Sequence, residues 1–275
     1  MTADKTYRGN PELYGKVEDI PGEQAQYELA ARIIQDFAQL HLERTCEGIT
    51  ILDLCCGTMA IPRMLLAARD PLKGPILYQE IIGVDIDQAY LDFARHEIEP
   101  HIGMGGAYFG LDADFLCRDA AEYLHQAKVD VILASSAYHH MDDGTHTVHN
   151  PKKASFLTRV RDQLKDDGIA VFCENLIPAF NNDSEYEAAT REFYVRRMNE
   201  LLDMGIKDER IDLLCRVMRY GLDREYELKT HYYGLMATLE NADLEVVVEQ
   251  KVWPSKSMFD DSLAGDYVIV ARNRP

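Results

Sequence analysis

Two apolar segments in the first third of the chain each end in an acidic residue and a tight turn. Residues 49–59 read ITILDLCCGTM, with Asp53 and Gly57, and residues 81–87 read IIGVDID, with Asp85. A glycine turn that opens into a helix leaves backbone N–H groups free for a ligand, and an acid after the next strand can accept hydrogen bonds from a ribose diol. Together the two segments predict a site for a nucleotide-like cofactor.

A pair of histidines, His139 and His140, follows another apolar segment, in VDVILASSAYHHM at 129–141. In a doubly wound sheet the pair would stand beyond the carboxyl end of a strand, where such sheets bind their ligands. A neutral imidazole near pH 7 can orient a substrate or remove a proton from it. The alternative is a structural pair that closes the loop or packs under the cofactor.

The residues after this pair could also hold a metal ion. Asp142, Asp143, His146 and His149 supply suitable donor atoms. Their spacing matches no standard zinc pattern, however, and a solvated loop with an Asp-Gly turn explains them. We therefore expect no bound metal.

The elements that must position these residues alternate between strand and helix. Apolar runs predict a strand from Ile49 and further strands at 80–85, 114–117, 129–134, 169–176, 244–252 and 266–271. Helical spacing of apolar residues predicts helices at 22–42, 60–68, 89–98, 120–126 and 152–164. Such alternation is typical of an α/β fold with a doubly wound, mostly parallel seven-stranded sheet.

The alternation stops after residue 176. Residues 181–240 read as about three helices with no strand between them, which indicates a helical cap insertion. The last two strands have no helix between them, so we expect an antiparallel edge strand. The expected organisation is an N-terminal segment with its leading helix at 1–45, a Rossmann-like core at 46–178, the cap at 179–241 and the closing strands at 242–275.

Composition narrows the classes of partner. The 275 residues carry a net charge of -18, which repels the phosphate backbone of nucleic acids, so no nucleic acid is expected as substrate. The chain has neither a run of apolar residues long enough for a membrane span nor an apolar N-terminal run typical of a signal peptide, so we expect a cytoplasmic protein that binds no membrane. The six cysteines have no CxxC pairing, which favours reduced thiols.

The motifs in this order resemble those of the class I S-adenosylmethionine (SAM)-dependent methyltransferases, over about 49–176 and the closing strand pair. Asp53 and Gly57 match the first motif, Asp85 matches the ribose-binding acid, and Asp119 with the Ala120 backbone matches the adenine site. The family has glycines at the positions of Cys55 and Met59. The resemblance implies SAM as cofactor, and the residues it implies as contacts are Tyr14, Asp53, Cys55, Cys56, Gly57, Thr58, Asp85, Ile86, Asp119, Ala120, Ser135 and Ser136.

Two other segments are expected near the ligands. The N-terminal segment with Tyr7, Arg8 and Tyr14 resembles the leading segments that fold over SAM in small-molecule methyltransferases. In the cap, residues on one helical stripe and a later tyrosine are expected to bind the acceptor; they are Tyr186, Thr190, Tyr194, Arg197 and Tyr232. The alternative for each of these rings is simple packing of the cap onto the sheet.

The resemblance implies transfer of a methyl group from SAM to an O or N atom of a small-molecule acceptor. The transfer is an in-line displacement, in which His139 or His140 would assist by positioning or deprotonation. One alternative is a SAM-binding protein of the same fold with other chemistry or a regulatory role. A nicotinamide-dependent oxidoreductase is a further alternative, against which the missing GxGxxG counts. The sequence identifies neither the acceptor nor the oligomeric state, for which a homodimer is one possibility.

Overall fold

Seven strands form one sheet within the residues that the structure describes. They are β1 (Ile49–Leu54), β2 (Tyr78–Asp85), β3 (Asp112–Cys117), β4 (Val129–Ser135), β5 (Leu164–Leu176), β6 (Leu244–Trp253) and β7 (Gly265–Asn273). The structure is a computed structural model, and it describes residues 10–67, 77–102, 110–145, 147–224, 227–254 and 259–274. Tyr7, Arg8 and His146, which the sequence singled out, lie outside the described residues.

The strand order is β3-β2-β1-β4-β5-β7-β6. The first five strands in chain order pair in parallel, whereas β7 runs antiparallel to both β5 and β6. The predicted fold class is therefore confirmed: the sheet is mostly parallel and doubly wound, with an antiparallel pair closing one edge. The strand order reverses between β1 and β4, which is the place where open α/β sheets bind ligands.

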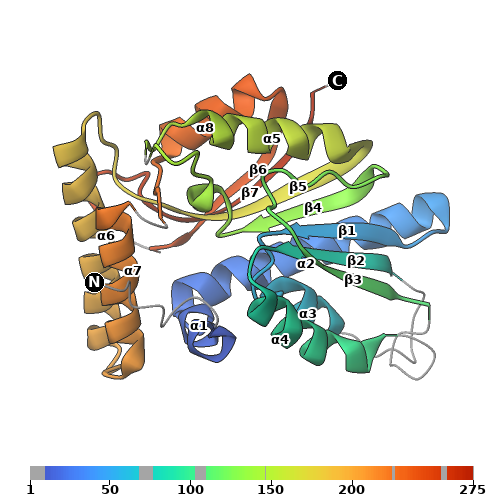
Figure 1. The fold of residues 1–275 in the computed structure, drawn as a ribbon, viewed down its shortest axis with the longest axis horizontal. Coiled ribbons are helices and arrows are strands. Elements are labelled where there is room, and N and C mark those ends of the chain that lie inside the picture. The colour runs from blue at the N-terminus through green and yellow to red at the C-terminus, as the bar shows by residue number, and fades with distance from the viewer. Residues whose placement is uncertain are drawn as a thin grey trace.

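Helices cover both faces of the sheet (Figure 1). On one face lie α2 (Pro21–Thr45), α3 (Ala60–Ala67) and α4 (Gln88–Ile98), whose apolar residues share a core with β1 and β2. On the other face lie α5 (Pro151–Gln163) and α8 (Tyr232–Asn241), which bury their apolar residues against β4, β5 and β7. The apolar strands are thus covered on both sides, as parallel strands usually are.

Three more helices lie beyond the carboxyl ends of the parallel strands. Here α6 (Asp183–Asp203) and α7 (Glu209–Asp223) pack on each other, and α1 (Pro11–Glu18) shares their apolar cluster (Figure 1). The segment predicted as a cap thus contains two kinds of helix, because α8 packs on the sheet beside α5. Two short 3-10 helices, Glu99–His101 and Tyr138–His140, complete the described elements.

The helix predicted at 120–126 is wrong. Residues 119–123 form a single turn, in which the Asp119 carboxylate accepts the Ala121 N–H at 2.9 Å and the Asp119 carbonyl accepts the N–H groups of Glu122 and Tyr123. Side chains of Asp readily satisfy backbone donors in this way and so compete with helix formation. The connection from β3 to β4 is therefore a loop.

No helix among the described residues is both long and apolar enough to cross a membrane. All six cysteines are described, and all are free thiols.

Candidate functional site

The turn after β1 is built on three residues with left-handed backbone. Cys55, Gly57 and Met59 have φ angles of 54°, 50° and 55°. Only glycine adopts this conformation without cost, since a Cβ approaches the following carbonyl and costs about 1–2 kcal/mol per residue. The two positions where the family has glycine are thus two of the three left-handed positions here.

The Met59 side chain is directed into the core. It is fully buried among residues of β1, α3 and β2, and a Cβ added to Gly83 would lie 2.8 Å from its Sδ atom. Gly83, in the middle of β2, therefore leaves the space that the Met59 thioether fills. The bulk of Met59 is accommodated by the core beneath the turn.

Asp85, at the end of β2, holds two neighbouring turns together. Its carboxylate accepts the Gly57 N–H at 2.9 Å and the Asp87 N–H at 2.8 Å. Burial raises the pKa of Asp85, although these hydrogen bonds and then the nearby His140 oppose the shift. A carboxylate with two oxygens can accept further hydrogen bonds, as a ribose diol would require.

Asp119 and Cys55 lie beside Asp85. Burial, and after it the Asp85 and Asp119 carboxylates, raise the pKa of the Cys55 thiol well above its usual range. The Asp119 carboxylate also pairs with Lys152 at 2.9 Å. The ends of β1, β2 and β3 thus bring together the donor set that SAM would need: an open turn, an acid for the ribose and an acid for the adenine.

The other predicted cofactor residues have diverse surroundings. Asp53 is buried, and burial followed by the nearby Asp85 raises its pKa well above the usual range. Cys56 and Ala120 are also buried, whereas the Ile86 residue is 67% exposed beside Asp85. The Thr58 hydroxyl bonds to Glu18 of α1, and Arg63 binds both residues at 3.1 Å.

Tyr14 connects the turn after β1 with a pocket under the cap. Its ring lies 5.6 Å from the Tyr90 ring, and its Cε1 atom would be 3.9 Å from a Cβ at Gly57. The same tyrosine lines a pocket whose walls come from α1, α2, the strand ends, α6 and α7. Its lining residues include Ser136, His139 and Asn175.

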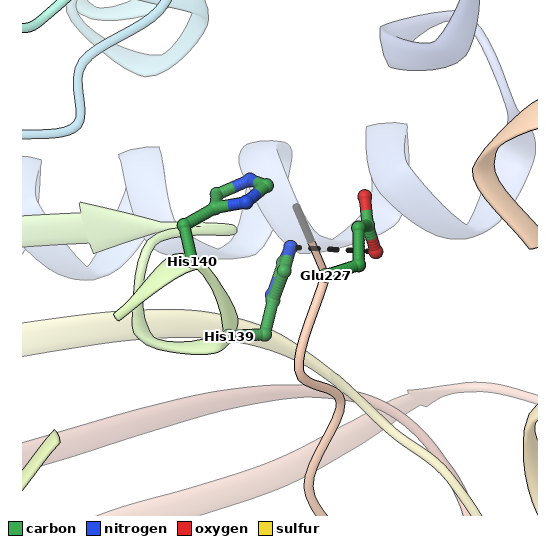
Figure 2. Close-up of side chains that lie close together, drawn as sticks. All are labelled: His139, His140 and Glu227. Atoms are coloured by element: carbon green, nitrogen blue, oxygen red, sulfur yellow. Dashed lines mark ion pairs between the residues drawn. The ribbon is translucent and has the colours of Figure 1, made fainter. Parts of the chain in front are cut away.

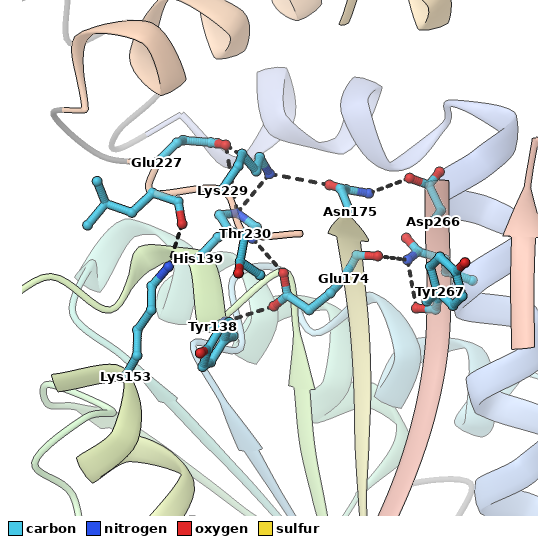
Figure 3. A network of polar contacts seen from close by, with 12 residues as sticks. Tyr138, His139, Lys153, Glu174, Asn175, Glu227, Lys229, Thr230, Asp266 and Tyr267 are labelled. Atoms are coloured by element: carbon cyan, nitrogen blue, oxygen red, sulfur yellow. Dashed lines mark hydrogen bonds and ion pairs between the residues drawn. The ribbon is translucent and has the colours of Figure 1, made fainter. Parts of the chain in front are cut away.

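His139 is held from both sides (Figure 3). Its Nδ1 atom lies 2.8 Å from Glu174 Oε2, and its Nε2 atom lies 3.2 Å from Lys229 Nζ. Because the carboxylate needs a donor and the ammonium can only donate, the proton must be on Nδ1 and the lone pair on Nε2. Burial, followed by the Lys229 charge, lowers the pKa of His139 well below its usual range.

Lys229 is the cation at the centre of this buried network. Its Nζ atom lies 2.9 Å from Glu227 Oε2 and 3.4 Å from Asn175 Oδ1. Asn175 in turn donates to Asp266 at 2.8 Å, which extends the network to β7 (Figure 3). Each buried charge in this series has a partner, as buried charges must.

His140 differs from His139 in exposure and surroundings. It is partly exposed, and its ring centroid lies 4.2 Å from that of His139. It is close enough to Asp85 on one side and to Glu227 on the other to influence the pKa of each carboxyl. His140 is therefore within electrostatic range of both Asp85 and Glu227, and Glu227 lines the pocket under the cap.

One group among the described residues could hold a metal ion. Single ligand atoms of His139, His140 and Glu227 lie within 4.8 Å of one another (Figure 2). The Lys229 ammonium, however, is bonded to both Glu227 and His139. A metal ion would have to displace Lys229 from these two donors.

The five residues predicted to bind the acceptor separate into two sets. Tyr194 and Arg197 line the pocket. Tyr186 and Thr190 are buried behind them on α6, where the Tyr186 hydroxyl donates to the Gly221 carbonyl at 2.9 Å. Tyr232, on α8, donates to Glu249 of β6 at 2.7 Å and does not line the pocket.

The sequence analysis missed the charged and polar residues around which the pocket is built. They are Glu23, Glu174, Asn175, Glu227, Lys229 and Asp266, all buried. A signal was present for two of them, since Glu174 follows an apolar strand segment directly and Asp266 precedes one. An ionisable residue beside a buried strand needs a partner, and it could have been flagged for that reason.

The comparisons with known proteins agree with this geometry. The family model of a methyltransferase domain matches residues 52–172, which is the segment from β1 to β5. No curated protein matches the chain by sequence.

Several solved structures share the fold. A SAM-dependent methyltransferase from Clostridium acetobutylicum has 12% identity and a TM-score of 0.55, with 96% of this chain and 99% of that chain covered. Magnesium protoporphyrin IX methyltransferase from Synechocystis, solved with bound S-adenosylhomocysteine, has 9% identity and a TM-score of 0.56, with 98% and 96% covered. Mitomycin 7-O-methyltransferase has 14% identity and a TM-score of 0.52, with 95% and 60% covered.

The matched domain, the strand order and the acids at the ends of β1, β2 and β3 thus have one explanation. Residues 52–172 match a methyltransferase domain, the chain has the fold of the class I SAM-dependent methyltransferases, and this domain and fold indicate SAM as the cofactor.

Proposed function

We propose that this protein transfers the methyl group of SAM to an O or N atom of a small molecule bound in the pocket under α6 and α7. The observation that carries the proposal is the position of this pocket. It begins at Tyr14, beside the cofactor turn, and extends to Tyr194 and Arg197 of the cap. An acceptor held there would face the methyl donor across Ser136 and His139, and the His140 ring lies next to that of His139.

The two histidines have different roles in this proposal. Both ring nitrogens of His139 are occupied by Glu174 and Lys229, so His139 positions its neighbours and transfers no proton. His140 is the partly exposed member, placed between Asp85 and Glu227. We assign to His140 the orientation of the acceptor and, for a hydroxyl acceptor, the removal of its proton.

SAM would supply the electrophilic methyl group, and the residues of this chain would align the acceptor with it. Asp85 and the turn at 55–59 would hold the nucleoside end, with Asp119 at the adenine. The cap and α1 would help to exclude water from the pocket, because Val17, Leu214 and Val217 of their apolar cluster line it. Alignment is the larger part of catalysis in such a displacement.

Met59, which stands where the family has glycine, is the residue that favours the alternative of a non-catalytic SAM-binding protein. The Met59 side chain lies in the core against Gly83, so its bulk is directed away from the surface of the turn. Small-molecule acceptors also appear in the names of two proteins that share the fold, magnesium protoporphyrin IX methyltransferase and mitomycin 7-O-methyltransferase. These observations support methyl transfer over binding alone.

The test is incubation of the protein with SAM labelled in its methyl group and a fractionated pool of phenols, alcohols and amines. We expect S-adenosylhomocysteine to form together with a labelled product. His140→Ala should lower kcat with the Kd of SAM unchanged, whereas Asp85→Ala should weaken SAM binding about tenfold or more through the lost carboxylate contacts. SAM binding without any S-adenosylhomocysteine formed from any fraction would favour the non-catalytic alternative.

A further inference from the structure

Glu23, in the first turn of α2, has one carboxylate oxygen in use and one without a partner. Its Oε1 atom accepts from Arg197 at 2.9 Å and from Asn175 at 3.2 Å. Its Oε2 atom is buried and has no hydrogen-bond partner among the described residues. Since Glu23 is only 3% exposed and lines the pocket, this oxygen is a strong acceptor with no access to bulk water.

The glycine before Glu23 allows the start of α2 to pack closely against the residues that bind Glu23. A Cβ at Gly22 would collide with the Asp266 carboxylate and the Arg197 guanidinium, so glycine is needed for Glu23 to reach them. Arg197 joins Glu23 to Asp266 by ion pairs, and both acids are buried. The Glu23 side chain is therefore fixed in position, with its second oxygen left without a hydrogen-bond partner.

The charges around the pocket favour a cation as that ligand. Arg197 pairs with both Glu23 and Asp266, so at this end of the pocket one cationic side chain serves two buried carboxyl groups. The rings of Tyr14 and Tyr194 also line the pocket, and aromatic faces attract cations. An unpaired carboxylate oxygen in such surroundings binds a protonated amine better than a neutral hydroxyl group.

We propose that Glu23 anchors a protonated amine carried by the methyl acceptor, which makes the acceptor a small amine with a second, reacting group. This inference rests on the proposed function, because it names the class of molecule that fills the same pocket. The amine binds at the side of the pocket that α2 and α6 form. The group that receives the methyl lies toward Tyr14 and Ser136.

The experiment compares three probes that differ in one terminal group. Tyramine, tyrosol and 4-hydroxyphenylacetate share a phenol ring and carry an ammonium, a hydroxyl and a carboxylate group, respectively. Calorimetric titrations use the 275-residue chain saturated with S-adenosylhomocysteine, so that the cofactor site is filled. We expect tyramine to bind about tenfold or more tightly than tyrosol, with 4-hydroxyphenylacetate the weakest. Equal or tighter binding of tyrosol would overturn the proposal without recourse to any variant.

Two variants test which carboxylate is responsible for the preference for tyramine. Glu23→Gln keeps an oxygen for Arg197 and Asn175 but removes the charge, and it should abolish the preference for tyramine. Glu227→Gln removes one charge from the same pocket, but that carboxylate is already bonded to Lys229 and Tyr194, so the preference should persist. An undiminished preference in Glu23→Gln would show that the anchor is elsewhere and would overturn the assignment.

SAM itself carries an ammonium group, to which Glu23 could bind in place of an amine of the acceptor. The affinity for SAM distinguishes these two cases. The Kd of SAM should be the same in Glu23→Gln and in the original protein. A loss of SAM affinity with no change in tyramine affinity would assign Glu23 to the cofactor and refute the proposal. Failure of methyl transfer with a retained tyramine preference would refute the proposed function alone, whereas turnover of neutral acceptors without that preference would refute only the anchor.

Discussion

At the scale of single residues, Lys153 shows how burial changes acid–base behaviour. The side chain is 1% exposed on α5, with its Nζ atom bonded to the Leu228 carbonyl and 4.9 Å from the centroid of the Tyr138 ring. Burial lowers the pKa of Lys153 to about 7, although the Glu174 carboxylate opposes the shift. The native protein therefore releases this proton at a pH at which the unfolded chain still holds it.

This difference in the pKa of Lys153 between the native and unfolded states predicts how the free energy of unfolding changes with pH. Between about pH 7 and 9 the unfolded state holds more protons at Lys153, so its contribution to the free energy of unfolding rises with pH by up to about 1.4 kcal/mol per pH unit. Below the native pKa both states are protonated and the contribution is constant. Urea unfolding of the original protein and of Lys153→Met should give a difference in free energy that rises over this range.

Lys128→Met is the matched control, because Lys128 is half exposed and pairs with Asp166 at the surface. The difference between the original protein and this variant should be constant with pH. A constant difference for Lys153→Met as well would mean that Lys153 keeps its proton in the native protein.

At the scale of elements, the turn after β1 and the strand β2 are fitted to each other. The turn carries Met59 in a left-handed conformation, which costs free energy, and burial of the thioether beneath it offsets that cost. Gly83 makes the fit possible, since a Cβ there would approach Met59 Sδ to 2.8 Å and Cys56 Sγ to 3.1 Å. The two positions should therefore be energetically coupled.

A double-mutant cycle measures this coupling. Gly83→Ala should destabilise the protein by about 1–3 kcal/mol through overpacking. The cost should be lower by about 1 kcal/mol or more in a Met59→Ala background, where the sulfur is absent. Both free energies come from urea unfolding. Gly15→Ala in α1, where a Cβ would meet only Glu18 at 4.0 Å, should be additive with Met59→Ala. Additivity of Gly83→Ala with Met59→Ala would contradict the fit described here.

At the scale of the whole molecule, the cap is joined to the core by buried charges. Arg197 of α6 binds Glu23 of α2 and Asp266 of β7, and all three side chains are almost completely buried. Separating the cap would leave these charges unpaired, which costs about 3–5 kcal/mol for a buried pair. We therefore expect α6 and α7 to unfold together with the sheet.

Trp253 reports on this junction. It is the single tryptophan of the chain, and its ring lies 5.5 Å from that of Phe193 and 5.0 Å from the Arg197 guanidinium. Unfolding in urea should give coincident transitions by tryptophan fluorescence and by far-ultraviolet circular dichroism. An earlier fluorescence transition would indicate that the cap separates before the sheet unfolds.

Much of the fold could be predicted, because apolar runs and helical spacing are local properties. The strands and most helices follow from them, as does the antiparallel closure by β7. The helix predicted at 120–126 was wrong because the Asp119 side chain and carbonyl take up the backbone donors of a single turn. The packing of α8 on the sheet, beside α5, also depends on contacts between distant segments.

For this protein the sequence by itself determined the order of strands and helices, the acids at the strand ends and, through its motifs, the cofactor. Those features depend on residue type and spacing along the chain. Only the tertiary structure decided that Glu23 and Arg197, 174 positions apart, form one ion pair, and that His139 is held by Glu174 and Lys229. The physical reason is that buried charges must find partners across the fold, and sequence spacing carries no record of which charges will meet.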